Sequence, residues 1–217
     1  MIPARERLRT PRAAAIAGIL FAVLLTTVLA LILSSVPKDP LEPGSWLSAN
    51  PRRVMIAVYL MPFSGIAFLW FVGVVRDRLG DAEDRLFATV FLGSGLLFIS
   101  MMFIAASIFG AIVLVNASRP EALANSTAFL LARAFAYNLA NIYAVKMAGV
   151  FMVVTSTLAL RTGFLARWIA FLGLGMAAIL LFASQLFDFS FAIFPTWALL
   201  ISVYILVDNF QMRPGHS

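Results

Sequence analysis

The stretch from residue 118 to residue 160 constrains the fold most, because it is largely apolar yet carries Arg133 and Lys146 well away from its ends. A Ser-x-x-Glu capping box that starts at Ser118 predicts a helix beginning near Arg119. At about 1.5 Å per residue, a continuous helix over the stretch would be roughly 60 Å long, twice the ~30 Å of a bilayer's hydrocarbon. We therefore expect half of this helix to lie outside the lipid or along its surface.

The composition predicts an all-α membrane protein. Of the 217 residues, 62% are hydrophobic and 12% are charged, whereas soluble domains are typically ~45 to 50% apolar. The apolar runs predict six transmembrane helices in a single domain over residues 1–217. The predicted spans are about 13–33, 53–75, 86–115, 141–160, 165–186 and 191–207, and a proline-rich outer loop covers 36–50.

The third and fourth predicted helices are both longer than a bilayer requires. The apolar run 86–115 would be roughly 45 Å long as a helix. The short connection after it makes the two helices an antiparallel pair, so we expect a hairpin that extends to the outer side. Its outer apolar half then needs cover from the 36–50 loop, from other helices or from another subunit.

The distribution of basic residues predicts the orientation, since cytoplasmic loops are enriched in Lys and Arg. Six spans place both termini on one side of the membrane. That side carries most of the basic residues: Arg5, Arg7, Arg9, Arg12, Arg76, Arg78, Arg85, Arg161, Arg167 and Arg213. The other side carries Lys38, Arg52, Arg53 and Arg119. Both termini are therefore expected in the cytoplasm.

The sequence lacks the residues that several kinds of catalytic and metal sites require. The chain has no cysteine and one histidine, His216, which removes thiolate metal sites, bis-histidine haem and a Ser-His-Asp triad. No phosphate-binding or dinucleotide-binding glycine motif is present. The basic residues lie at helix ends rather than in a nucleic-acid-binding patch. We predict no catalytic residue, metal, cofactor or nucleic-acid partner.

Polar residues of the fourth predicted helix, together with Asp188 in the turn before the sixth predicted span, form the candidate ligand-binding site. The predicted site residues are Arg133, Tyr137, Asn138, Asn141, Lys146 and Asp188. With Arg161 at the cytoplasmic boundary, Lys146 lies about 22 Å and Arg133 about 42 Å along the helix. A charged residue at membrane depth is a functional hypothesis by default, whereas one near the edge can reach the headgroups.

Each cation also has a purely structural interpretation. Arg133 could contact a lipid headgroup or a carboxylate, and Lys146 could pair with Asp188. At 100° per residue the two cations point in different directions, so they are not expected to form one site by themselves.

The segment MPFSGIAFLWFVGVVRDRLGDAEDRLFATVFLGSGLLF, which covers the second and third predicted helices, resembles uncharacterised bacterial multi-pass membrane proteins, particularly of actinobacterial type. No activity is attached to this family. The resemblance implies a location in the bacterial inner membrane and supplies no functional residue.

The leading functional hypothesis is an integral membrane binding or transport protein, a channel or carrier. Its outward-facing polar site would favour an anionic solute or a lipid headgroup. The alternative is a non-transporting accessory subunit that acts through helix–helix association, with membrane lipids and further copies of the chain as partners. An integral membrane enzyme comes third, because no nucleophile and base pair is visible.

Overall fold

The structure is a computed structural model that describes residues 11–42, 44, 46–79, 85–118, 126–186 and 190–211. Every regular element among them is a helix, which confirms the all-α prediction. The elements are α1 (Pro11–Leu33), α2 (Trp46–Ala49), α3 (Pro51–Leu79), α4 (Arg85–Ser118), α6 (Thr127–Asn138), η2 (Leu139–Ala144), α7 (Val145–Thr162), α8 (Arg167–Ala178), η3 (Ile179–Ala183) and α9 (Ser190–Gln211). The segments η2 and η3 are π-helical turns.

Five helical stretches are long and apolar enough to cross a membrane. They are Ile16–Leu33, Pro51–Asp77, Leu86–Ser118, Thr127–Thr162 and Ser190–Asp208. A further apolar helical stretch, Arg167–Ala183, is shorter and covers most of the predicted segment 165–186. These lengths and compositions fit a multi-pass membrane protein.

The helix that carries Arg133 and Lys146 is continuous. The stretch Thr127–Thr162 holds 36 residues, or roughly 54 Å of helix. Its N-cap is Ser126, whose side chain accepts a hydrogen bond from the Phe129 backbone N–H at 3.1 Å. Ser118 is the last residue of α4, so the long helix is capped by Ser126 and not by the predicted Ser118. The rest of that predicted capping box lies outside the described residues.

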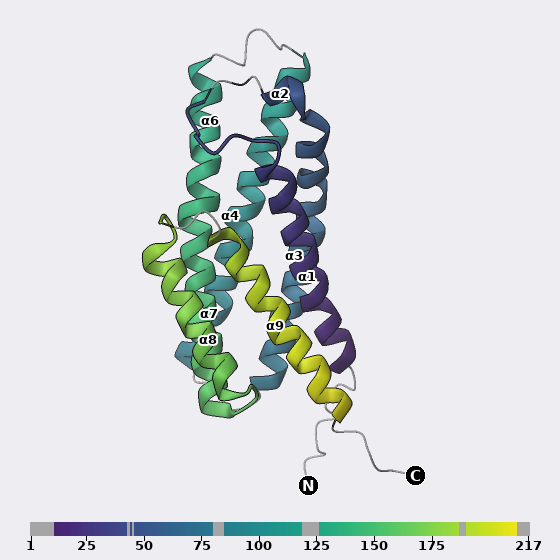
Figure 1. The fold of residues 1–217 in the computed structure, drawn as a ribbon, viewed down its shortest axis with the longest axis vertical. Helices are drawn as coiled ribbons and strands as arrows, with labels where there is room; N and C mark the ends of the chain where they lie inside the picture. Colours follow the sequence, from purple (N-terminus) through teal and green to yellow (C-terminus); the bar gives the residue numbers. More distant parts are fainter. Residues whose placement is uncertain are drawn as a thin grey trace.

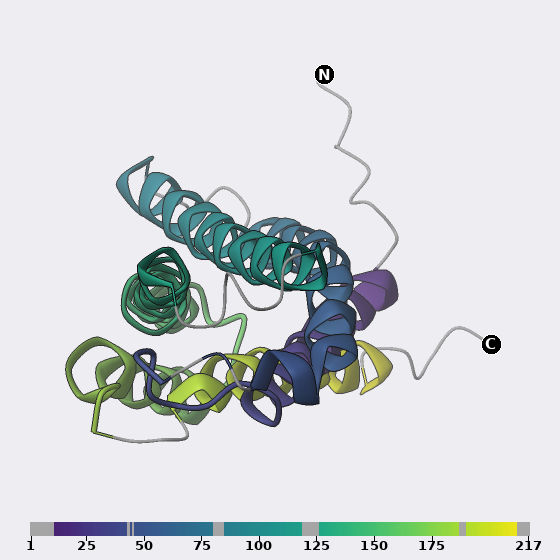
Figure 2. The same ribbon diagram turned by 90° about the horizontal axis from the view of Figure 1, so that it is seen from above.

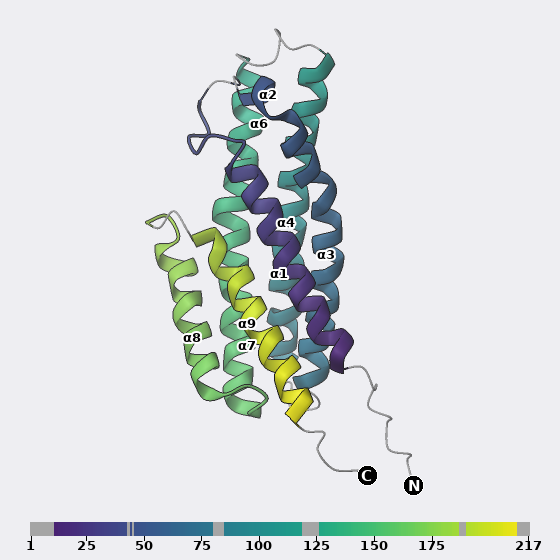
Figure 3. The same ribbon diagram turned by 45° about the vertical axis from the view of Figure 1, so that its right-hand side comes forward.

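The helices form a bundle with two distinct ends. The start of α1 and the end of α9 lie at one end, and α2 and the start of α6 lie at the other, which we call the distal end (Figure 1). In the bundle, α1 packs against α3 and α9, α4 packs along α6, η2 and α7, and α8 packs against α7 (Figure 2). Because α8 and α9 stop short of the distal end, α4 and α6 extend beyond them (Figure 3).

Aromatic side chains form the centre of the bundle. Phe21 of α1, Phe68 of α3, Phe151 of α7, and Phe194 and Trp197 of α9 are buried. Their ring centroids lie 4.8 to 6.1 Å apart in successive contacts, the range in which tilted and edge-to-face pairs are favourable. This packing holds α1, α3, α7 and α9 together.

A separate apolar cluster forms at the distal end. Trp46 of α2 is buried, and its ring centroid lies 6.5 Å from that of Phe109 in α4 and 6.3 Å from that of Phe129 in α6. Ile112 and Val113 of α4 belong to the same cluster. Trp46 of the predicted outer loop therefore covers part of the apolar distal half of α4, which confirms that this loop supplies cover.

Candidate binding site

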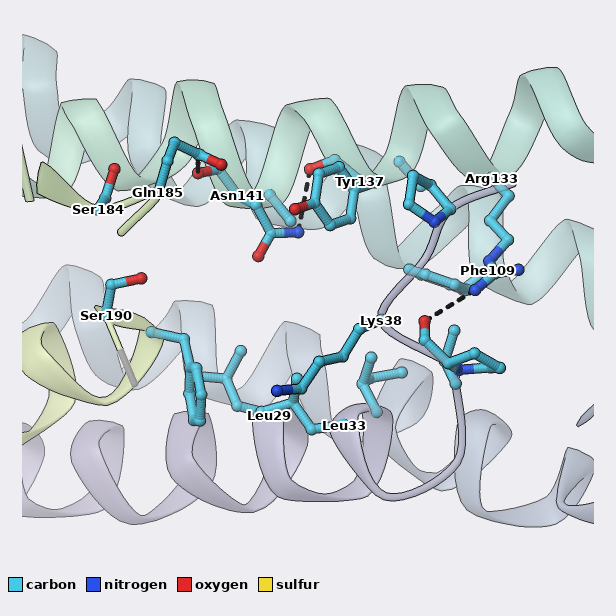
Figure 4. Close-up of a pocket in the computed structure, with 17 residues that line it drawn as sticks. Leu29, Leu33, Lys38, Phe109, Arg133, Tyr137, Asn141, Ser184, Gln185 and Ser190 are labelled. Atoms are coloured by element: carbon cyan, nitrogen blue, oxygen red, sulfur yellow. Dashed lines mark hydrogen bonds between the residues drawn. The ribbon is translucent and has the colours of Figure 1, made fainter. Parts of the chain in front are cut away.

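A cavity of mixed lining, which we call the polar cavity because several polar side chains converge on it, lies where the shorter helices stop against the long α6–η2 helix. Its volume is about 210 Å³, well above what a single water needs. The polar residues that line it are Lys38, Arg133, Tyr137, Asn141, Ser184, Gln185 and Ser190, and its apolar wall includes Leu29, Ile32, Leu33, Phe109 and Phe191. In Figure 4 the polar side chains of α6 and η2 lie opposite Leu29 and Leu33 of α1. The cavity thus joins segments that are far apart in the sequence.

The π-helical turn η2 arranges the polar wall. A π turn bonds each backbone N–H to a carbonyl five residues earlier instead of four, and such turns are frequent at functional sites. Within this turn the Asn141 side-chain Nδ2 donates to the Tyr137 carbonyl at 3.1 Å. The Asn141 carbonyl in turn accepts from Gln185 Nε2 at 3.2 Å, as Figure 4 shows. The Gln185 bond ties the turn after η3 to the α6–η2 helix beside the cavity.

Arg133 fixes the loop that closes one side of the cavity. Its side chain is only 1% exposed, and its guanidinium donates to the Pro37 carbonyl at 2.8 Å and to the Glu42 carbonyl. Its Cζ lies 5.7 Å from the ring centroid of Trp46, within cation–π range. The carboxylates of Glu42 and Asp39 also attract the guanidinium. Arg133 therefore holds residues 37–42 against α6 while its positive charge stays in the cavity wall.

Lys146 has a different set of partners. Its ammonium donates to the Leu180 carbonyl at 3.0 Å, to the Leu181 carbonyl at 2.6 Å and to Ser184 Oγ at 3.0 Å. An ammonium has three N–H donors, so these acceptors use all of them. The position also suits a cation, since the C-terminal end of a helix carries partial negative charge. Lys146 does not line the cavity but positions Ser184, which does.

The structure brings together only part of the predicted site. Arg133, Tyr137 and Asn141 line the cavity. Asn138 is exposed and is not among the lining residues. Asp188 lies outside the described residues, so its predicted pairing with Lys146 stays a prediction.

Sequence reasoning did not select several lining residues. Lys38 and Pro37 come from the 36–50 segment, which was predicted only as a cover. Ser190 begins α9, and Leu29 comes from the first predicted span. The run of prolines in the loop was the one available signal, because proline restricts the backbone and favours a fixed course.

A second, smaller cavity adjoins the first. Its volume is about 50 Å³, and its lining is almost entirely apolar. Both cavities are bordered by Leu29, Ala140, Asn141, Ser190 and Phe191. The apolar cavity therefore lies next to the polar one and is bordered by core residues such as Phe98 and Phe194.

Within the described part of the chain, no group of three or more His, Cys, Asp or Glu side chains could hold a metal ion. No protein-family model matches the chain, and no curated protein or solved structure matches it. The resemblance of the α3 and α4 region to bacterial membrane proteins accordingly stays a prediction.

Proposed function

We propose that this protein is an integral membrane binding protein of the transport class, and that its polar cavity binds the anionic group of a solute or lipid. The observation that carries the proposal is the cavity of about 210 Å³, where polar side chains from α6, η2, α9 and the 37–42 loop converge in a strongly apolar protein. Ligand sites typically combine an apolar lining with a few convergent polar groups.

The preference for an anion rests on the charges and donors at the cavity. Arg133 donates to neutral carbonyls, and although the carboxylates of Asp39 and Glu42 attract its charge, neither of these two residues lines the cavity. Lys38 adds a second basic side chain to the wall. The Tyr137, Ser184 and Ser190 hydroxyls can donate to phosphate or carboxylate oxygens. Such charge-assisted bonds are roughly twice as strong as neutral ones.

The proposal includes a topology. Six segments cross a bacterial inner membrane, with Arg167–Ala183 as the shortest, and both termini lie in the cytoplasm. The excess of arginine near the start of α1, between α3 and α4, and between α7 and α8 supports this orientation. The distal end is then the outer side, and α4 and α6 form the hairpin that extends there. The polar cavity opens outward.

The experiment is a binding measurement on purified protein in lipid nanodiscs, with inorganic phosphate and acetate as probes and choline as the cationic contrast. Tyr137→Phe removes one hydroxyl from the cavity wall. A typical hydrogen bond contributes ~0.5 to 1.5 kcal/mol, so we expect the affinity for the better anion to fall by about 2- to 13-fold. Tyr143→Phe is the matched control, because Tyr143 is 56% exposed and does not line the cavity.

The proposal fails if neither anion binds, or if the two tyrosine variants weaken binding equally. Either result would favour the alternative, a non-transporting accessory subunit, which one observation already supports. Both Arg133 and Lys146 bond acceptors of this same chain, so their charges also have a structural role. An accessory subunit should associate with copies of itself in nanodiscs or detergent, which mass photometry would detect.

A further inference from the structure

We propose that the ligand is a single-chain amphiphile whose anionic group occupies the polar cavity and whose apolar chain enters the adjoining apolar cavity. This inference rests on the proposed function and specifies its ligand class. It begins from the two cavities being neighbours, since Asn141 and Ser190 border both of them.

The lining of the smaller cavity suits an alkyl chain better than it suits water. Its lining includes Leu25, Phe98, Met102, Ala148, Leu180 and Phe194. A bound water typically makes about three hydrogen bonds, and this lining offers few polar partners for them. The polar groups among the lining, Asn141 and Ser190, lie on the shared border. An alkyl chain beyond that border would meet only apolar atoms.

The two cavities differ in their lining in the way that the two parts of an amphiphile differ. Arg133 and Lys38 line only the polar cavity, and Phe98 and Phe194 line only the apolar one. A ligand with a charged group and an alkyl chain would place its charged group beside the basic side chains and its alkyl chain beside the aromatic ones. Met102 is a flexible side chain of the sort that adapts to different chain shapes.

The size of the apolar cavity predicts how affinity depends on chain length. Each methylene moved from water to an apolar site contributes ~0.8 kcal/mol, which converts to roughly a fourfold gain in affinity. A volume of about 50 Å³ holds only a short length of chain. Affinity should therefore rise over the first few methylenes and then level off.

The test uses full-length protein in nanodiscs, with empty nanodiscs subtracted to correct for partitioning of the probes into lipid. The probes are inorganic phosphate and the butyl, hexyl and octyl phosphates, and in parallel acetate, butanoate, hexanoate and octanoate. We expect the butyl phosphate or butanoate to bind at least 10-fold more tightly than its chainless anion. The chainless probes represent a free solute, and the alkyl probes represent a lipid-like ligand.

Ala148→Val narrows the apolar cavity, because Ala148 lies in its wall and is 1% exposed. We expect this variant to bind the chainless anion as the unmodified protein does and to lose most of the chain-length gain. Ala159→Val is the matched control: it makes the same change at a buried alanine of α7 that lines neither cavity. The chain-length series on the unmodified protein tests the inference even if a valine variant does not fold.

Equal affinity for chainless and alkyl probes would overturn the amphiphile inference and leave the proposed function standing. The same conclusion follows if Ala148→Val weakens both kinds of probe equally while Ala159→Val weakens neither. Absence of binding by every anion would overturn the proposed function and this inference together.

Discussion

Replacing Lys146 by methionine tests the link between the long helix and η3. The change keeps much of the apolar stem and removes the ammonium that donates to Leu180, Leu181 and Ser184. Hydrogen bonds between membrane helices contribute ~0.6 kcal/mol on average and ~1.7 at most. Three such bonds amount to about 2 to 5 kcal/mol. Because Lys146 is only partly buried, we expect a loss near the lower limit, about 2 kcal/mol.

The assay is reversible unfolding in mixed detergent micelles, followed by circular dichroism, for the unmodified protein, Lys146→Met, Ser184→Ala and the double variant. Ser184→Ala alone should cost about 0.5 to 1 kcal/mol, because it removes one acceptor. The double variant should lose less than the two single losses combined, since the Lys146 to Ser184 bond can be lost only once. A Lys146→Met variant as stable as the unmodified protein, or strictly additive losses, would refute the reasoning.

Two further predictions concern packing and the 37–42 loop. A Cβ at Gly173 would collide with Ser156 Oγ and lie 2.7 Å from Trp197 Nε1, so Gly173→Ala should cost about 1 to 3 kcal/mol of unfolding free energy. Gly175→Ala is its control, since nothing lies within 4 Å of that position, and equal losses would contradict the packing. Arg133→Lys keeps the charge but loses the planar fork, so backbone amides of residues 38–42 should exchange hydrogen faster in mass spectrometry. Unchanged exchange would show that Arg133 does not hold the loop.

The helices were predictable from the sequence because their apolar runs are long and uninterrupted. The excess length of α4 and of the Thr127–Thr162 helix follows directly from the number of residues, as does the need to cover the distal part of α4. Trp46 and Phe129 provide part of that cover. Physical constraints of this kind depend on composition and length alone.

The partners of the two cations were not predictable. Arg133 bonds carbonyls 91 and 96 residues away, and Lys146 bonds carbonyls 34 and 35 residues away. Every residue carries a backbone carbonyl, so such partners leave no signature in the sequence. The sequence indicated only a carboxylate, Asp188, as a partner for Lys146.

The most direct test of the central claim is whether the polar cavity is reached from outside the cell. The chain has no cysteine, so a single introduced thiol reports on one position. Ser190→Cys places a thiol in the cavity wall at the start of α9. Thr162→Cys places one at the C-terminal end of the long helix, the end predicted to face the cytoplasm. We predict that a membrane-impermeant thiol reagent labels Ser190→Cys in intact spheroplasts and labels Thr162→Cys only after permeabilisation. Labelling of Ser190→Cys only after permeabilisation would contradict an outward-facing site.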